Sequence, residues 1–144
     1  MYLDNASTTP LLPEVKDYII EILDNYQNPS SLYQSGSHSK QILTKARVNV
    51  AKFINANPGD IIFTSGGSAS NTLIIKGYAQ KNDCMVLYSP IAHKSVLKCV
   101  ESLEYKTPLK VDRRGYINIE VLEHLLKQTT MKKLVVIDYA NSEI

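Results

Sequence analysis

Hydrophobic positions in the first part of the chain recur at the spacing of amphipathic helices. After Pro13, a residue that suits a first helical turn, apolar side chains stand three and four positions apart as far as Leu23. A second pattern of this kind predicts a helix over about 37–55, and the turn formers Asn57-Pro58-Gly59 end it. The segment before Pro13 is polar, so we expect two regions: an N-terminal segment, 1–12, and one domain over 13–144.

The hydrophobic pattern changes after Asp60, where short apolar runs alternate with helical periods. Strands that alternate with helices form a mostly parallel sheet with helices packed on its faces. The predicted fold is therefore α/β, with three layers and helices on both faces of a mostly parallel sheet. We expect strands over 61–64, 85–88, 109–111 and 134–139, and helices over 68–80, 92–103 and 119–126.

This alternation stops at a hydrophobic strand, without a helix to cover it, so we expect the domain over 13–144 to be incomplete. Ligands of parallel sheets bind beyond the carboxyl ends of the strands. Three polar or glycine-containing clusters fall at such ends, 65–68, 90–93 and 139–143. We expect these clusters to lie close together and to form the site.

Composition excludes several classes of protein. A net charge of +2 with scattered lysines argues against a nucleic-acid partner. Cys84 and Cys99 are the only cysteines and lack metal-ligand spacing, so we expect free thiols in a reducing compartment and no metal site. No apolar run reaches membrane-spanning length, and no signal peptide is visible. These features predict a soluble protein of the cytoplasm.

The cluster Ser65-Gly66-Gly67-Ser68 joins a predicted strand to a predicted helix. Glycines allow a tight turn and the close approach of a ligand. The first helical turn then presents unpaired N–H groups and the positive end of the helix dipole, which together favour a phosphate or another anion. An ordinary strand-to-helix turn explains the same residues, and the local pattern alone leaves both readings open.

With these clusters in place, the whole chain resembles the cysteine desulfurases, which are pyridoxal-phosphate enzymes of fold type I within the class V aminotransferase superfamily. The resemblance is specific in the order of its motifs. The segment Phe63–Asn71 is similar to the family's phosphate-binding loop, and His93-Lys94-Ser95-Val96 to the segment whose histidine stacks on the cofactor ring. Other matches are the opening Tyr2–Thr9, the loop Asn28–Ser31 with Gly36, and Ala140–Ile144.

The resemblance implies roles for four residues. Gly67 and Ser68 would hold the phosphate of pyridoxal 5′-phosphate through a backbone N–H and a hydroxyl. His93 would lie over the pyridine ring and transfer protons. Ser142 stands where the family has an asparagine that hydrogen-bonds the ring oxygen of the cofactor, and a serine reaches less far.

The resemblance also implies a reaction and partners. Cysteine desulfurases convert L-cysteine to L-alanine and pass the sulfur, as an enzyme-bound persulfide, to an acceptor or scaffold protein for iron–sulfur clusters or thiolated cofactors. Family members are homodimers of the cytoplasm or an organellar matrix. The family's pyridinium aspartate, cofactor-linked lysine, substrate-binding arginine and catalytic cysteine match nothing here, so we expect the chain alone to be inactive.

Several residues that invite a role match none of these family positions. Lys94 is not the cofactor-linked lysine, Asp138 is not the pyridinium acid, and neither Cys84 nor Cys99 is the catalytic cysteine. His38 and His124 match no motif and are expected at the surface.

Two alternatives to a cysteine desulfurase remain. Ala69 and Ala92 replace family glutamates, which, together with Ser142, is typical of a degenerate, non-catalytic paralogue kept as a binding module. The other alternative is a different class V lyase or aminotransferase.

Overall fold

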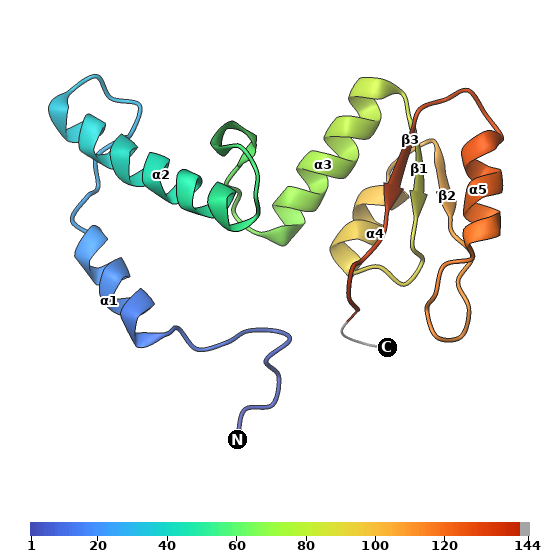
Figure 1. The fold of residues 1–144 in the computed structure, drawn as a ribbon, viewed down its shortest axis with the longest axis horizontal. Helices are drawn as coiled ribbons and strands as arrows, with labels where there is room; N and C mark the ends of the chain where they lie inside the picture. The colour runs from blue at the N-terminus through green and yellow to red at the C-terminus, as the bar shows by residue number, and fades with distance from the viewer. Residues whose placement is uncertain (142–144) are drawn as a thin grey trace. The chain divides into compact units, whose positions relative to one another are not determined.

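The computed structural model describes residues 1–141 and divides the chain into two compact units, Met1–Phe63 and Thr64–Ile144. Each unit is described by itself, and Figure 1 shows their elements. The first holds helices only, and the second holds a parallel sheet with helices.

The first unit contains the helices α1 (Pro13–Ile22) and α2 (Gln34–Phe53) and a short 3₁₀ turn, η1 (Pro58–Asp60). Pro13 stands at the start of α1, as predicted. Helix α2 begins a few residues earlier than its apolar pattern, because Gly36 and Ser39 are buried although neither is apolar. In α1 no residue is buried within this structure.

The segment 61–64 is not a strand, contrary to prediction. A strand requires a neighbour for its hydrogen bonds, and no pairing of this segment occurs among residues 1–141. Arg47 of α2 instead donates from Nε to the carbonyl oxygen of Ile61 at 3.1 Å. Its guanidinium lies 5.5 Å from the ring centroid of Phe63, a cation–π arrangement. The segment is therefore extended and tied to α2 by one side chain.

The second unit is an alternation of helices and strands, as its hydrophobic pattern predicted. The sheet is parallel with the order β2-β1-β3, and β1 pairs with β2 from Val86↔Lys106 and with β3 from Met85↔Lys133. Its elements in chain order are α3 (Gly67–Asn82), β1 (Met85–Tyr88), α4 (Lys94–Glu101), β2 (Lys106–Pro108), α5 (Ile119–Lys127) and β3 (Lys133–Val136).

Helices cover both faces of the central strand β1. Val86 and Leu87 are each 0% exposed, and successive strand residues point to opposite faces of a sheet. The chain moves from β1 to β2 and then back across β1 to β3, so right-handed crossovers place α4 and α5 on opposite faces (Figure 1). Val86 packs with residues of α3 and α4 in the main hydrophobic cluster. The predicted three-layer α/β fold is thereby confirmed.

Strand β2 lies three residues before the predicted 109–111. Its sequence, Lys106-Thr107-Pro108, is polar and contains a proline, which is tolerated because β2 is an edge strand. The predicted Leu109 is buried just beyond it, and its N–H donates to the carbonyl oxygen of Tyr88 at 2.8 Å. The apolar pattern thus identified Leu109, which is buried next to β2, and not the residues of β2 itself.

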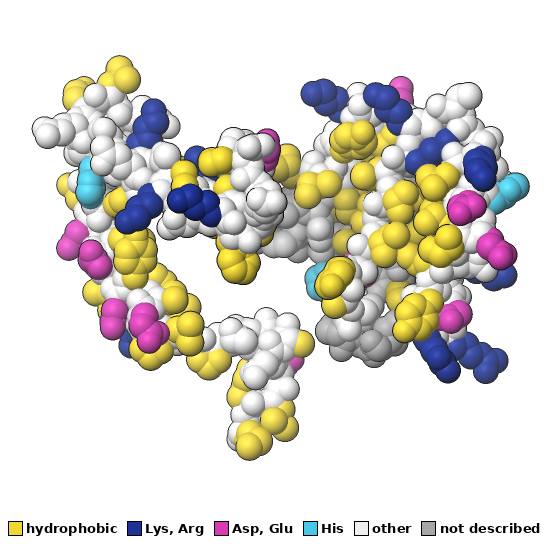
Figure 2. Space-filling model, viewed as in Figure 1, with side chains coloured by type: hydrophobic (Ala, Val, Ile, Leu, Met, Phe, Trp, Pro, Cys, Tyr) yellow, Lys and Arg dark blue, Asp and Glu magenta, His cyan; other side chains and the backbone are white. Residues whose placement is uncertain are grey.

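Apolar side chains remain exposed on both units, as the yellow surface in Figure 2 shows. In the second unit they include Val135 of β3 and the following Ile137 and Tyr139. In the first they include Tyr18, Ile19 and Ile20 of α1. No helix among the described residues combines the length and the hydropathy needed to cross a membrane.

Candidate functional site

The start of α3 is an open, pre-formed turn. Gly66 has φ 151° and ψ 179°, a conformation that L side chains rarely adopt, and its N–H donates to Thr64 Oγ1 at 3.4 Å. The same hydroxyl lies 2.7 Å from Ser70 Oγ, so Thr64 ties the turn to the first helical turn. A Cβ added at Gly67 would meet no atom within 4 Å, and Ser68 is exposed. The backbone at Gly67 and Ser68 is therefore open to the approach of a ligand.

His93 caps the start of α4. It precedes the helix with φ −52° and ψ 145°, and its Nδ1 accepts from the backbone N–H of Ser95 at 3.2 Å. The predicted helix over 92–103 therefore begins two residues late, because the turn from Ser89 to Ala92 is closed by its own hydrogen bond of 3.2 Å. His93 itself is exposed, and Ala92 beside it is 5% exposed.

One hydrogen bond joins these two helix starts. Asn71 of α3 donates from Nδ2 to Ser95 Oγ of α4 at 2.8 Å, and both residues are half-buried. Ser68 lies three residues before Asn71, and such a pair shares one face of a helix. Ser68 is thus on the side of α3 that faces the start of α4, where His93 stands.

The segment after β3 reaches the same edge of the sheet. Asn141 donates from Nδ2 to the carbonyl oxygen of Ile91 at 2.9 Å, in the turn that leads to His93. This bond joins the predicted clusters 139–143 and 90–93, and the Asn71–Ser95 bond joins the helices that follow the clusters 65–68 and 90–93. Ser142, the fourth predicted site residue, lies outside the described residues.

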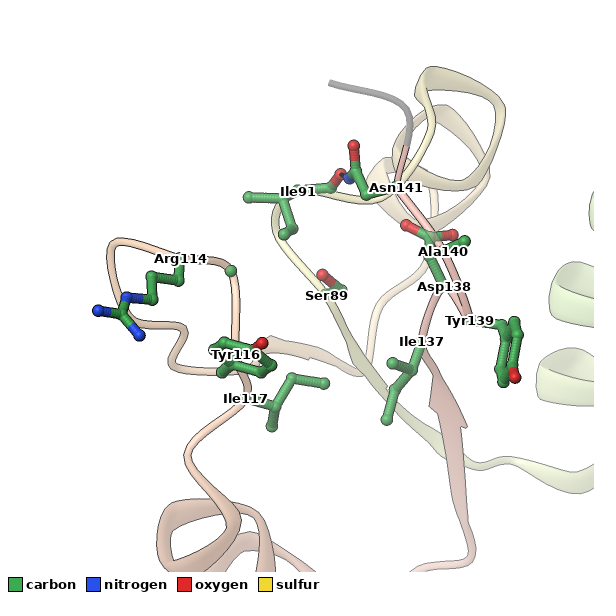
Figure 3. A pocket seen from close by; sticks show the side chains of 11 residues that line it. Ser89, Ile91, Arg114, Tyr116, Ile117, Ile137, Asp138, Tyr139, Ala140 and Asn141 are labelled. Carbon is green, nitrogen blue, oxygen red and sulfur yellow. Dashed lines mark hydrogen bonds between the residues drawn. The ribbon is translucent and has the colours of Figure 1, made fainter. Parts of the chain in front are cut away.

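A cavity of about 250 Å³ lies beyond the carboxyl ends of the strands (Figure 3). The loop after β1 supplies Ser89, the loop after β2 supplies Arg114 and Tyr116, and the segment after β3 supplies Asp138. Asp138 Oδ2 is buried and has no hydrogen-bond partner among residues 1–141. The loop of Arg114 is held by Asp112, whose Oδ1 accepts from two backbone N–H groups at 2.8 and 2.9 Å.

The remaining candidate side chains lie where the sequence placed them. His38 and His124 are exposed, and Lys94 is exposed at the first helical position of α4. Cys84 and Cys99 are buried free thiols, 3% and 5% exposed, and burial raises the pKa of the Cys84 thiol. Within residues 1–141 no three or more His, Cys, Asp or Glu side chains are grouped as metal ligands would be.

Sequence reasoning missed Ser95 and gave Asn71 no role. Both lie within motifs that were recognised. Each is a small polar residue of a kind that often caps a helix or is exposed on its surface, and so draws no attention. Their pairing joins positions 24 residues apart, and no local pattern signals a contact of that length. The one available clue was that both lie near the starts of helices that follow the predicted clusters 65–68 and 90–93.

Comparison with known proteins gives the same family throughout. The model of the family described as Aminotransferase class-V matches residues 1–144. Among curated relatives, a cysteine desulfurase IscS of Dictyoglomus turgidum is 38% identical, with 100% of this chain and 38% of that protein covered. Cysteine desulfurase IscS 1 of Archaeoglobus fulgidus is 33% identical, with 99% and 39% covered.

Solved structures agree with these relatives. A NifS-like protein from Rickettsia africae superposes with a TM-score of 0.90 at 34% identity, over 98% of this chain and 40% of that one. A second structure described as a NifS-like protein gives a TM-score of 0.89 at 31% identity, over 98% and 40%. The chain therefore spans about two fifths of the length of the proteins it matches.

Proposed function

The chain belongs to the class V aminotransferase family, and on that premise we propose that it is the N-terminal portion of a pyridoxal-phosphate-dependent cysteine desulfurase. The relatives whose names state an activity are called cysteine desulfurases, and their alignments cover 99–100% of this chain. The substrate of the longer protein would be L-cysteine and its products L-alanine and a protein-bound sulfur atom.

The observation that carries this proposal is the open turn at the start of α3. Gly66 holds a backbone conformation that favours glycine, and the space beside Gly67 is free. N–H groups of a first helical turn lack partners within their helix and attract anions. The hydroxyl of Ser68 is exposed at the same turn. These residues fit a phosphate, and Gly67 and Ser68 would hold that of pyridoxal phosphate.

His93 is the proposed catalytic residue of this portion. Its ring is exposed at the start of α4, next to the face of α3 that carries Ser68. Bound pyridoxal phosphate would supply an electron sink for bonds at the substrate's α-carbon. The chain's own contribution would be the phosphate seat formed by Gly67 and Ser68, the imidazole over the ring, and a proton held at His93 Nε2. Ser142 would approach the ring oxygen of the cofactor.

The remaining catalytic groups would be supplied by segments that these 144 residues do not match. By resemblance these are the cofactor-linked lysine, the pyridinium aspartate, the substrate-binding arginine and the catalytic cysteine. The assignment of 13–144 to part of the cofactor-binding domain stays a prediction. The longer protein would be a cytoplasmic homodimer that delivers sulfur to an acceptor or scaffold protein, and exposed apolar side chains of α1 suit such an interface.

A degenerate binding module is the second candidate. Ala92, 5% exposed, leaves no acidic group in the position directly before His93, and Ala69 likewise lacks a carboxylate in the first turn of α3. A protein that had lost catalysis would tolerate both changes. Cofactor affinity separates the candidates, because a module of this kind has no need to retain the phosphate seat. Another class V lyase or aminotransferase would keep the seat and differ in its substrate.

Titration with pyridoxal phosphate tests the proposal on the 144-residue chain. The double variant Gly67→Val, Ser68→Ala should weaken binding at least tenfold, since a side chain then fills the space beside the N–H groups. Pyridoxal, which lacks the phosphate, should bind weakly to both proteins, and Gly77→Ala, in open space further along α3, is the matched control. Equal affinity for pyridoxal phosphate before and after the double change would place the site elsewhere.

A further inference from the structure

Three hydrogen bonds meet at His93 and Ser95. The backbone N–H of Ser95 donates to His93 Nδ1 at 3.2 Å. The Ser95 hydroxyl lies 2.7 Å from the same Nδ1, and Asn71 Nδ2 lies 2.8 Å from the Ser95 oxygen. The imidazole is therefore connected through one hydroxyl to Asn71 of the neighbouring helix α3.

The backbone N–H fixes the direction of every bond in this chain of groups. A backbone N–H can only donate, so Nδ1 must carry a lone pair and no proton. The Ser95 hydroxyl then has to donate to Nδ1 as well, because two acceptors cannot bond to each other. Its oxygen is left to accept, which requires that Asn71 present its amide nitrogen and not its amide oxygen. Each group has one consistent role.

We infer that Ser95 and Asn71 are positioning residues that hold His93 in its Nε2–H tautomer, with Nε2 as the nitrogen presented to a ligand. Asn71 and Ser95 are half-buried between α3 and α4, whereas His93 is exposed. The nitrogen that faces the protein is thus occupied twice, and the other is left for a ligand. The same bonds fix the rotation of the ring relative to α3.

This tautomer limits what His93 does, and that consequence rests on the proposed function. A neutral ring with its proton on Nε2 donates a hydrogen bond from Nε2 and has no lone pair there to accept a proton. Acceptance at Nε2 requires a change of tautomer, in which Nε2 loses its proton and Nδ1 takes one. That change breaks the bond from the Ser95 N–H. It also reverses the donor and acceptor roles in the bond between Ser95 and His93 and in the bond between Ser95 and Asn71. The resting His93 is therefore a donor, and Ser95 is the group that must turn for it to act as a base.

Nitrogen-15 NMR of the imidazole rings tests the inference on the chain without any cofactor, under alkaline conditions that keep histidine neutral. His93 should show a single Nε2–H tautomer, whereas the exposed His38 and His124 should show the mixture of a free imidazole. Asn71→Asp offers only acceptors, so the Ser95 hydroxyl should turn toward it. The Nδ1–H form should then become the major form of His93.

Two further variants separate positioning from general structural damage. Ser95→Ala keeps the backbone donor and should shift the Nδ1 resonance by removing one of its two donors, and Ser95→Thr should restore it. Ser102→Ala, at the other end of α4, should leave the His93 signals unchanged. If Asn71→Asp does not fold, the wild-type and Ser95 spectra still decide the question.

Either of two results would overturn the inference: a tautomer mixture at wild-type His93, or His93 signals that Ser95→Ala and Asn71→Asp leave in place. These measurements need no pyridoxal phosphate. A failure of cofactor binding therefore contradicts only the proposed function, and a wrong tautomer contradicts only the inference.

Discussion

The carbonyl oxygen of Asn28 lies against the α-carbon of Gly36, so close that a Cβ at Gly36 would stand 2.8 Å from it. The same Cβ would be 2.6 Å from Cβ of Ser31. The loop cannot easily withdraw, because Asn28 accepts from Ser30 N–H through Oδ1 and from Ser31 N–H through its carbonyl oxygen. Loop and helix start are therefore one packed unit, and Gly36 is its contact point.

Gly36→Ala should destabilise the first unit by about 1–3 kcal/mol, because a methyl group is forced against backbone atoms. Amide hydrogen exchange along α2 is the measurement, and exchange should become faster from Gln34 onward. Gly77→Ala is the control, since a Cβ there meets nothing within 4 Å and removes a helical glycine, with an expected gain of about 0.5–1 kcal/mol. Equal protection of the α2 amides from exchange in wild type and Gly36→Ala would show that the loop moves to accommodate the methyl group without loss of stability.

No single lysine should form a covalent link to pyridoxal phosphate in the 144-residue chain. Lys94 stands beside His93, but it is exposed as the first residue of α4 and matches no cofactor-linked lysine of the family. Borohydride reduction followed by peptide mapping should give low, scattered labelling, and cysteine should release no sulfide. Stoichiometric label on one lysine together with cysteine-dependent sulfide would show that this chain is catalytically complete. Lys94→Gln is the control variant: its labelling should equal that of the wild type if Lys94 carries no specific label, and should be lower if it does.

The Cys84 thiol should make the second unit less stable at alkaline pH. Burial raises its pKa in the folded chain, against an ordinary value of about 8.5 in the unfolded chain. Its contribution to stability is complete below the unfolded value and declines as pH rises above it, because the unfolded state then releases a proton that the folded state retains. Urea unfolding across this range should show a decline that Cys84→Ala reduces. A decline of the same size in both proteins would assign the loss to other groups.

Ser39→Ala should stabilise the first unit. Ser39 is 7% exposed in the interior of α2, and its hydroxyl has no hydrogen-bond partner among the described residues. The change removes a buried unsatisfied group and introduces the best helix former, for an expected gain of about 1 kcal/mol. Ser37→Ala, at an exposed position of the same helix, is the control and should gain less. A loss of stability at Ser39 alone would indicate that the hydroxyl is bonded in solution.

Elements whose signal is local were predicted well. Strand β1 has the predicted bounds, since Val86 and Leu87 of the apolar run Met85–Tyr88 are buried on opposite faces and the polar Ser89 follows it. Helix α3 begins one residue before its predicted start, because a glycine pair followed by small polar residues marks a strand-like segment that turns into a helix. Both depend on residues adjacent in sequence.

Elements that depend on distant partners were predicted poorly. The segment 61–64 has the composition of a strand, but composition does not reveal whether a neighbour is present to pair with it. Strand β2 forms through its register with Val86, in spite of its own polar sequence. The hydrogen bonds of Ser95 and Asn71 likewise depend on the packing of α3 against α4. Motifs located the site, and only the tertiary structure showed what orients His93.

The strand order β2-β1-β3 has a consequence for synthesis on the ribosome. Strand β1 emerges with neither neighbour, gains β2 after one helix, and pairs with β3 only when Lys133 to Val136 have been made. At about 5–20 residues per second, the 44 residues between β1 and β3 (89–132) take several seconds to translate. Throughout that interval the central, most apolar strand has an open edge in the nascent chain. The growing polypeptide is therefore exposed to misassociation from the completion of β1 until the arrival of β3, with both edges of β1 open before β2 forms and one edge open after it.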